Sequence, residues 1–200
     1  TIIPGGVTID LKKDVVQTLF SAIEKLTSEF NKFLGFIQKE KFLKHRLKGI
    51  GIPSVQVNNA VGPLARSMGI KVDARLASNY YTEIGFTPVV FDEGDNFSRI
   101  KVRIFEIFES AKLIQESVKR IEDEIKCEPV YELPRGESSA NCESGTGEIV
   151  VSIVSDGSTR PCQITITSPR EKNSKILENI LENVSREDKP HTKLLAKGFV

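Results

Sequence analysis

The chain has 200 residues, of which 39% are hydrophobic and 28% are charged, so it can build the core of one medium domain or two small ones. Its formal net charge of +1 gives no bulk electrostatic reason to expect binding to nucleic acid or to an anionic membrane surface. No stretch approaches the roughly 18 consecutive apolar residues of a membrane-spanning helix, so we expect no direct membrane span. No secretion leader is visible, and the opening TIIPGGVT reads like an internal junction, which favours a chain cut from a longer protein.

The residues that bind metals in proteins are sparse in this chain. Cys127, Cys142 and Cys162 are odd in number and no two form a C-x-x-C pair, which indicates reduced thiols rather than a disulfide framework. His45 and His191 are too few and too scattered for a zinc or iron site. We therefore expect no cofactor bound by this chain, and no stoichiometric nickel, iron or zinc after purification.

The first strong helical pattern follows Asp10, which is a suitable N-cap for a helix that begins near Leu11. Steps of three and four between apolar residues predict an amphipathic helix. A break at 27–28 or at Gly35 would turn one long helix into a helical hairpin that reaches about Leu47. The apolar positions are Val15, Leu19, Ile23, Leu26, Phe30, Phe33 and Ile37.

The segment between the two strongest helical patterns is rich in glycine and proline. Ser54 can cap a short helix over about 55–60, and 61–75 reads as a loop with another short helix. Residues 79–95 show no helical period, so we expect a loop there with at most one short strand.

The strongest helical pattern starts at the N-cap Asp95 and runs to about Ile125. We expect its apolar face to be buried and its polar face to be solvated, with i,i+4 ion pairs. The expected buried face is Phe97, Ile100, Ile104, Phe108, Ala111, Ile114, Val118, Ile121 and Ile125. The expected solvated face is Arg99, Arg103, Glu106, Lys112, Glu116 and Lys119.

The last third of the chain changes character. EIVVSIV and QITIT alternate β-branched residues around the turn sequence SDGS, which predicts a β hairpin. Helical spacing returns through Ile176, Ile180 and Val184, and the polar tail after it reads as loose. The predicted fold class is mainly α with a small β hairpin (α+β), a helical bundle around one long central helix. We divide this single domain into a helical body (1–127), an active-site loop with hairpin (128–170), and a C-terminal helix with tail (171–200).

The tetrapeptide Pro-Arg-Gly-Glu at residues 134–137 sets an arginine shortly before this hairpin. Pro134 fixes the local backbone, Gly136 lets another surface approach, and the guanidinium of Arg135 suits a carboxylate, a phosphate or a polar metal-bound ligand. The combination would aim Arg135 at a ligand. Taken alone, however, it favours a structural turn with an ion-paired arginine.

Several stretches occur together in a characteristic order. They are PGGV (4–7), RLKGIG (46–51), VGPLARSMGIKVDAR (61–75), EGDNFSRIKVRIFEIFESAKLI (93–114), and ELPRGE (132–137) followed by SDGSTRP (155–161). As an ordered set covering about residues 4–170, they resemble the large subunit of energy-converting membrane-bound nickel-iron hydrogenases. They also resemble its relative, the quinone-site subunit of respiratory complex I. GPLAR followed by SMG looks closer to the hydrogenase branch. A competing interpretation, an unrelated helical protein with accidental matches, stays open.

The resemblance implies a site. In that family the arginine of the Pro-Arg-Gly stretch points into the active-site cavity, beside the nickel-iron centre in hydrogenases and towards the quinone cavity in complex I. It therefore implies a catalytic role for Arg135 and for Asp73, which lies in the matching Asp-x-Arg stretch. Asp95 and Arg99 are expected to pair structurally. The residues implied to support the cavity are Pro134, Gly136, Glu137, Arg66 and Arg75.

The sequence also departs from the hydrogenase pattern. In hydrogenases two C-x-x-C motifs, one before and one after this region, ligate nickel and iron, and neither is present here. Many members also have a histidine soon after the Pro-Arg-Gly-Glu, where this sequence has SSANCES, with Cys142 instead. A nickel-iron centre cannot form without its thiolate ligands. The chain is therefore predicted to be either a middle portion of the subunit or a degenerate relative.

Two functions follow from the resemblance. The first is a fragment of a redox subunit that passes electrons from iron-sulfur clusters to protons or quinone in a hydrogenase or NADH-quinone oxidoreductase type complex. It would be inactive alone, bound to a small iron-sulfur subunit and to membrane subunits, and peripheral on the cytoplasmic side. The second is a noncatalytic helical scaffold or interaction module derived from that family.

Overall fold

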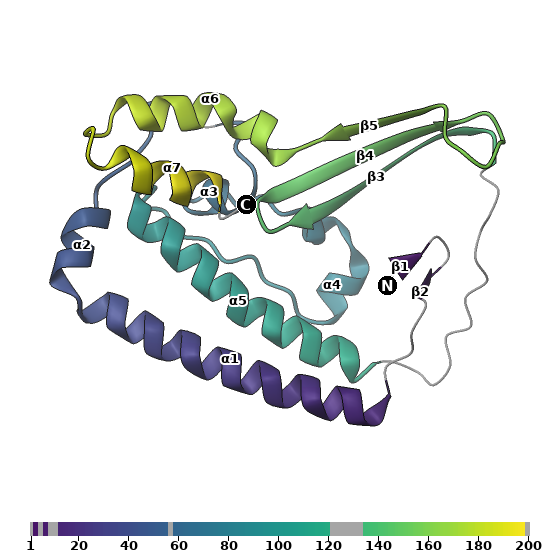
Figure 1. Cartoon of the computed structure of the whole chain (residues 1–200), viewed down its shortest axis with the longest axis horizontal. Helices are drawn as coiled ribbons and strands as arrows, with labels where there is room; N and C mark the ends of the chain where they lie inside the picture. The colour runs from purple at the N-terminus through teal and green to yellow at the C-terminus, as the bar shows by residue number, and fades with distance from the viewer. Residues whose placement is uncertain (1, 4–5, 8–11, 56–57, 121–133, 199–200) are drawn as a thin grey trace.

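The computed structural model describes residues 2–3, 6–7, 12–55, 58–120 and 134–198 (Figure 1). The elements in chain order are β1 (Ile2–Ile3), β2 (Gly6–Val7), α1 (Lys13–Lys39), α2 (Lys41–Leu47), α3 (Gly62–Arg66), the 3-10 helix η1 (Ala74–Ala77), α4 (Asn79–Glu83), α5 (Asn96–Val118), β3 (Gly136–Ser144), β4 (Gly147–Ser155), β5 (Gln163–Thr167), α6 (Pro169–Glu182) and α7 (Lys189–Lys197).

The predicted fold class is confirmed. Helices dominate, and the long helix α5 contacts α1, α2, α3 and α7, so it lies at the centre of the bundle (Figure 1). The β3-β4-β5 sheet is antiparallel throughout and extends away from the helices. None of the described helices is both long enough and apolar enough to cross a membrane.

The N-terminal helical pattern forms one 27-residue helix, α1, followed by the short helix α2. The break lies at Glu40, whose extended backbone separates the two helices, and neither 27–28 nor Gly35 interrupts α1. Thr27 lies within the helix, and its hydroxyl donates to the Ile23 carbonyl at 2.9 Å. The expected N-cap Asp10 lies outside the described residues, and Lys12 precedes the first helical residue.

Two predictions for the middle of the chain are wrong. The described residues within 55–60 are not helical, so the helix predicted there is wrong. The other short helix, predicted within 61–75, is confirmed as α3, with Pro63 in its first turn. The predicted loop over 79–95 contains the helix α4, and none of its residues is in a strand. The end of α4 is stabilised by a local contact, in which the Tyr81 ring packs edge-on against Phe86.

The start of α5 confirms Asp95 as its N-cap, because the carboxylate accepts a hydrogen bond from the Ser98 amide at 2.7 Å. Arg99, however, was expected on a solvated face and is buried. Its guanidinium donates to the carbonyls of Gly51 (2.7 Å) and Gly94 (2.9 Å) and to the side chain of Asn96 (2.8 Å). Burial lowers the pKa of Arg99 to about 10. Arg99 therefore anchors the helix start to two loops through carbonyl and amide oxygens, and the Asp95 charge acts on it only through space.

The rest of α5 follows the predicted pattern in part. Ile104 and Ala111 are buried as expected, but Ile114 is 41% exposed, so its predicted burial is wrong. The predicted polar face is also partly wrong, because Arg103 and Glu106 are half-buried. The helix ends at Val118, and the predicted extension over 121–125 and the boundary at 127–128 fall outside the described residues.

The predicted hairpin is confirmed as β4 and β5, which pair from Val154↔Gln163 to Val150↔Thr167. The strand β3 was not predicted, because GESSANCES lacks the β-branched residues typical of strands. It pairs along its full length with β4, from Gly136↔Ser155 to Ser144↔Gly147. Hydrogen bonding to the free edge of β4 thus sets this conformation rather than local propensity.

The C-terminal helix is confirmed as α6, whereas the predicted loose tail is wrong, since it contains α7. The buried hydroxyl of Thr192 accepts a hydrogen bond from Asn96 at 2.8 Å, which fixes α7 to the start of α5. The apolar core lies between α3, α6 and α7, and its buried members are Ala60, Leu64, Ala65, Ile176, Ile180, Val184 and Ala196.

Candidate functional site

A buried guanidinium lies at the centre of the candidate site. Arg66 ends the short helix α3 and is only 1% exposed, so its charge requires partners inside the protein. Its Nε donates to Glu106 at 2.7 Å, and its Nη1 donates to Glu143 and to the Val72 carbonyl, both at 2.8 Å. Nη1 also lies 3.0 Å from the Asp73 carboxylate. One arginine therefore joins α3, α5, β3 and the segment before η1.

Asp73 binds a second arginine, Arg75, next to Arg66. Its carboxylate accepts bonds from Arg75 Nε at 2.8 Å, Arg75 Nη2 at 2.7 Å and the Arg75 amide at 3.0 Å. The Arg75 guanidinium also stacks over Phe86, 4.2 Å from the ring centre. Glu143 closes the arrangement by accepting the Ala74 amide at 3.1 Å. We call Arg66, Asp73, Arg75, Glu106 and Glu143 the charge cluster.

The charge cluster places three carboxylates against two guanidinium groups. Burial raises the pKa of Glu106 above its usual value, against the lowering effect of the Arg66 charge and hydrogen bond. Burial prevails because Arg66 is shared among three carboxylates and cannot offset the desolvation of all of them. Glu106 therefore holds a proton more readily than an ordinary glutamate does.

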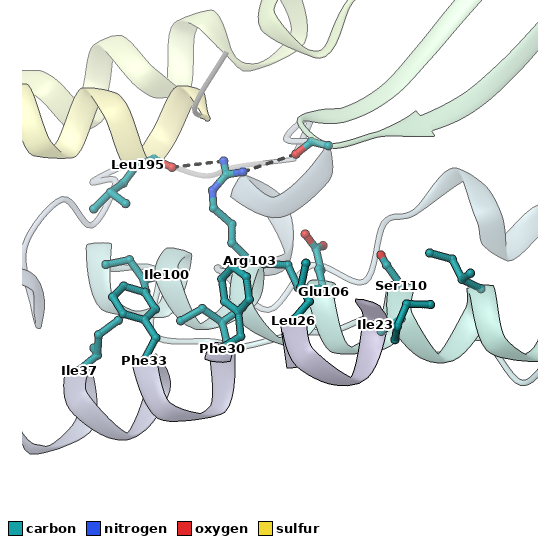
Figure 2. Close-up of a pocket in the computed structure, with 15 residues that line it drawn as sticks. Ile23, Leu26, Phe30, Phe33, Ile37, Ile100, Arg103, Glu106, Ser110 and Leu195 are labelled. Atoms are coloured by element: carbon teal, nitrogen blue, oxygen red, sulfur yellow. Dashed lines mark hydrogen bonds between the residues drawn. The ribbon is translucent and has the colours of Figure 1, made fainter. Parts of the chain in front are cut away.

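Two cavities flank the charge cluster. A cavity of about 280 Å³ opens between η1, α4 and β3, and its wall includes Arg75, Tyr81, Cys142 and Glu143. On the other side, Glu106 lines a much larger apolar groove of about 700 Å³ between α1 and α5 (Figure 2). The charge cluster thus forms part of the wall of a polar cavity and of an apolar one.

Arg103 stands at the edge of the apolar groove. Figure 2 shows its guanidinium pointing away from α1, towards the carbonyls of Leu195 and Gly145, each 3.5 Å away. Burial lowers the pKa of Arg103, with the Glu106 charge acting in the opposite direction. These long contacts tie α5 to α7 and to the β3–β4 turn.

The structure divides the predicted site residues into two groups. Arg66, Asp73 and Arg75 come together in the charge cluster, whereas Pro134, Arg135, Gly136 and Glu137 are all exposed. The second group lies at the far end of the sheet, where Gly136 pairs with Ser155 beside the β4–β5 turn.

The two groups do not share a cavity within the described part of the chain. Glu143 and Arg135 are separated by most of strand β3, on the order of 26 Å at the usual rise per residue. The sequence predicts that Arg135 is either at least partly exposed or paired with Asp73 or Glu137, and in the structure it is exposed. In the described residues, Arg135 has neither an ion pair nor a hydrogen bond with either of them.

Sequence reasoning missed two members of the charge cluster. Glu106 was expected on a solvated helix face, and Glu143 was hidden in a Ser- and Asn-rich stretch with no strand signal. For Glu106 the sequence offers a weak signal, because it lies one helical turn after Arg103 and follows the apolar residues Ile104 and Phe105. For Glu143 the sequence offers no local signal.

A second Gly-Glu dipeptide was also overlooked. Gly147 and Glu148 are the first two residues of β4 and lie at the end of the sheet nearest the helices. The backbone there is so close to α3 that a Cβ on Gly62, whose φ is +68°, would fall 2.3 Å from the Thr146 carbonyl oxygen. Glu148 accepts a bond from Lys172 at 2.8 Å. The Gly-Glu nearest the charge cluster is therefore this one.

Metal-binding side chains are not gathered in the described residues, where no group of three or more His, Cys, Asp and Glu side chains could hold an ion. Cys142 and Cys162 are free and exposed, and Cys127 lies outside the described residues. The Asp156 carboxylate raises the pKa of the Cys162 thiol through a hydrogen bond.

The charge cluster lies within the stretch over which the sequence resembles the respiratory-complex family, and the comparisons with known proteins test that resemblance. The family described as the respiratory-chain NADH dehydrogenase, 49 Kd subunit, matches residues 1–131 and 125–192. These two matches cover nearly the whole chain. The chain belongs to this family, and the predicted resemblance is confirmed.

Curated relatives agree with the family match. A subunit of the NADH-quinone oxidoreductase of Roseiflexus sp. (strain RS-1) is 30% identical over 82% of this chain and 48% of its own length. The corresponding NADH-quinone oxidoreductase protein of Clostridium beijerinckii is 30% identical over 82% of this chain and 47% of its own length. A subunit of the NAD(P)H-quinone oxidoreductase of Synechococcus sp. is 26% identical over 92% and 55%. The chain spans about half the length of the curated relatives it matches.

A solved structure shows the same fold. A chain of the membrane-bound sulfane sulfur reductase, an archaeal respiratory membrane complex, matches with a TM-score of 0.85. The match covers 98% of this chain and 56% of that chain, at 22% identity. At this identity the match describes the fold and carries no statement about chemistry.

Proposed function

We propose that this chain is the core of a redox subunit in a membrane-associated respiratory complex of the NADH-quinone oxidoreductase type. Electrons would arrive from iron-sulfur clusters of a small partner subunit and leave to an acceptor bound near the charge cluster. The observation that carries the proposal is that family membership and the buried Arg66–Asp73–Arg75 arrangement coincide on the same stretch of sequence. Buried, mutually paired charges beside a cavity are characteristic of functional sites.

Quinone is the acceptor that we favour over protons. The observation that supports quinone is that the curated relatives are named as quinone oxidoreductase subunits. In this proposal the chain binds no cofactor of its own. The iron-sulfur clusters belong to partner subunits.

Within the charge cluster we assign different roles to its members. Arg75 lines the polar cavity, where a planar guanidinium suits a carbonyl or an anionic oxygen of a bound ligand. Asp73 fixes the orientation of Arg75 through its two side-chain bonds. Arg66 holds Asp73 and Glu143 together, and Glu106 is placed to exchange a proton.

Arg135 lies outside the charge cluster, so we propose a different role for it. Because it is exposed at the far end of the sheet, it would act in catalysis at a surface that a neighbouring protein completes. Pro134, Gly136 and Glu137 would shape the same surface. We propose that the neighbours are a small iron-sulfur subunit and membrane subunits, with this chain on the cytoplasmic side of the membrane.

Purification from the native host tests this proposal. An affinity-tagged chain isolated from detergent-solubilised membranes should carry iron-sulfur signals in electron paramagnetic resonance spectra and should support NADH-dependent quinone reduction. Deletion of the chain should abolish that activity. A tagged chain that purifies alone at 22 kDa, from cells whose quinone reduction survives the deletion, would contradict the proposal.

A noncatalytic scaffold is the second candidate, and one observation favours it. Asp73 and Arg135, the two residues implied to be catalytic, lie at opposite ends of β3 and cannot act on one ligand within the described chain. Arg75→Lys keeps the charge but loses the planar fork. Normal turnover of an assembled complex that contains Arg75→Lys would support the scaffold, whereas loss of turnover with intact assembly would support the redox role.

A further inference from the structure

We propose that the end of α1 and the helix α2 together contact the surface of a bilayer that contains anionic phospholipids. We call residues 39–48, which form this part of the molecule, the basic corner. The proposal concerns a surface that the redox role proposed above does not use. It describes contact with the surface of a membrane, which is distinct from a membrane span.

Positive charge is concentrated in the basic corner. The whole chain has a net charge of only +1, yet residues 39–48 contain five Lys and Arg side chains and one acidic residue, Glu40. Lys41, Lys44 and Lys48 follow one another at helical spacing, so they lie along one side of α2. A local excess of this kind attracts negative charge even where the net charge of a chain is near zero.

The lysines of the basic corner are available to an outside partner. Four lysines form no ion pair within the described part of the chain, and they are Lys39, Lys41, Lys44 and Lys48. The fifth cation, Arg46, lies 2.8 Å from the carboxylate of Asp188, directly before α7, and Leu47 is buried. These two residues fix α2 to the helical body, so the lysines are held at the surface by a firmly packed helix.

An exposed aromatic side chain belongs to the same corner. Phe42 is 72% exposed, which is the largest exposed fraction of any large apolar side chain in the described residues. A single exposed phenylalanine carries little information by itself. Phe42, however, directly follows Lys41 and is surrounded in sequence by the other lysines. This composition is typical of segments that bind anionic membranes, in which the ring enters the boundary between headgroups and acyl chains.

The shape of the basic corner favours a membrane over a protein partner. Figure 1 shows α2 at one end of the long axis of the molecule. None of residues 39–48 lines the apolar groove or the polar cavity described above. A protein partner would need a recess that matches Phe42. A fluid bilayer instead accepts a projecting ring and lets long lysine side chains reach the headgroups.

The expected strength of this contact is moderate. Each lysine near an anionic bilayer surface strengthens binding about fivefold. Partial burial of a phenylalanine ring adds about tenfold. The four lysines and Phe42 together give a partition constant on the order of 10⁴ M⁻¹, similar to that of a single myristoyl chain. Binding of this strength is reversible, so the basic corner orients the chain on a membrane and does not anchor it alone.

Co-sedimentation of the complete 200-residue chain with vesicles tests the proposal. Vesicles of phosphatidylcholine with about one third phosphatidylglycerol are compared with vesicles of phosphatidylcholine alone. We expect binding to the anionic vesicles only. We also expect this binding to be lost in about 0.5 M salt, because screening then limits the attraction to a few Å.

A pair of double variants isolates the contribution of charge. Lys41→Gln combined with Lys44→Gln should weaken binding to the anionic vesicles about tenfold or more, because it removes two of the four unpaired lysines. The matched control is Lys25→Gln combined with Lys175→Gln, which removes the same charge from two exposed positions on α1 and α6. The control should change binding less than about threefold.

A second pair of variants isolates the contribution of the ring. Phe42→Ser should weaken binding about fivefold or more. The control is Ile166→Ser, which removes a 60% exposed apolar side chain from β5 and should leave binding unchanged. None of the substituted side chains is buried, so thermal unfolding followed by circular dichroism should stay close to that of the wild type.

Results with the vesicles can overturn the proposal in several ways. Absence of binding to the anionic vesicles at low salt would show that the basic corner does not contact a bilayer. Equal weakening by the two lysine double variants would assign binding to overall charge. Unchanged binding of Phe42→Ser would show that the ring does not enter the membrane. Binding to phosphatidylcholine alone that salt does not weaken would assign the contact to the apolar groove.

Two further results would assign the basic corner to a different ligand. Competition by inorganic phosphate, at matched ionic strength, would identify a site for a soluble phosphate. Loss of a subunit from the native complex with the lysine double variant, for a chain that binds no vesicles, would identify an acidic protein surface. Because vesicle binding is measured without a redox assay, its failure is separate from a failure of the proposed function.

Discussion

The Nη1 atom of Arg66 donates a hydrogen bond to Glu143 at 2.8 Å and joins two residues that are 77 positions apart in the sequence. This bond ties the end of helix α3 to the end of strand β3. The sheet also contacts the helical body through η1, through α6 and through the close approach of Gly62 to Gly147. The charge cluster therefore connects the sheet to the helical body and is also the candidate site.

The first prediction concerns the stability that the charge cluster provides. Arg66→Ala removes the shared cation and leaves the carboxylates of Asp73, Glu106 and Glu143 buried without it, so the free energy of unfolding should fall by about 3–5 kcal/mol. Urea denaturation followed by circular dichroism measures the change. Lys32→Ala, which removes an exposed pair with Glu29, is the control and should cost less than about 1 kcal/mol. Equal effects of the two substitutions would show that the buried network adds no stability.

The second prediction concerns pH. Burial raises the pKa of Glu106 in the folded chain above its usual value of 4.5. Above that usual value the unfolded chain has already released this proton, while the folded chain still holds it. The folded state therefore binds more protons in this window, and the contribution of Glu106 to stability falls as pH rises through it.

Glu106→Gln removes this titration and should flatten the corresponding part of the stability curve. The measurement is the free energy of unfolding in urea at a series of pH values from about 4.5 upwards, for the wild type and for Glu106→Gln. Every other titrating group is shared by the two proteins, so their difference isolates Glu106. A difference that grows in favour of the wild type as pH rises would reverse the sign and refute the raised pKa.

The third prediction compares two positions on α5. Val102 is 0% exposed, so Val102→Asp would bury an unpaired charge at a cost of several kcal/mol and should prevent folding. Ile114 lies on the same helix at 41% exposed, so Ile114→Asp should leave the melting temperature of the isolated chain nearly unchanged. Differential scanning fluorimetry of both variants checks this. A folded Val102→Asp or an unfolded Ile114→Asp would show that the described packing of α5 is wrong.

Helix α5 illustrates how much of the fold the sequence can predict. The three-four repeat correctly predicts that α5 is a long helix and that Asp95 caps it. The same repeat cannot say which parts of an apolar stripe are covered, because that depends on how far α1 packs along it. Ile114 follows the pattern as well as Ile104 does, yet it lies in the open groove.

The candidate site was predictable to a smaller extent. Arg66, Asp73 and Arg75 are close in sequence, and their stretch belongs to the family resemblance. Glu143 reaches Arg66 through the pairing of β3 with β4, although the sequence of β3 gives no β signal. The prediction of a loose tail failed for a similar reason, since the polar helix α7 depends on the Thr192 contact with Asn96. Long-range partners decide these elements, and local sequence does not encode them.

The fourth prediction concerns thiol reactivity. The Asp156 carboxylate raises the pKa of the exposed Cys162 thiol, so the reactive thiolate is less populated near neutral pH. Asp156→Asn should therefore increase the alkylation rate of Cys162 by iodoacetamide. Cys142 is also exposed and serves as an internal control, whose rate should not change. Peptide mass spectrometry resolves the two sites, and an unchanged Cys162 rate would argue against the Asp156 contact.

The last prediction concerns Arg135. It is exposed at the far end of the sheet, so Arg135→Lys should leave the unfolding of the isolated chain unchanged. In the complete complex, loss of the planar guanidinium should lower turnover about tenfold or more without loss of assembly, if Arg135 acts at a surface completed by a neighbour. Turnover of purified complexes and their subunit composition are the two measurements.

Arg160 provides the control for this experiment. It is also exposed and lies in the β4–β5 turn at the same end of the sheet, but it does not belong to the Pro-Arg-Gly-Glu stretch. Arg160→Lys should leave both assembly and turnover unchanged. If Arg135→Lys unfolds the chain while activity per folded complex persists, Arg135 has a structural role. If both variants lower turnover alike, this end of the sheet contributes a general positive charge, because the guanidinium geometry of one arginine cannot then be the cause.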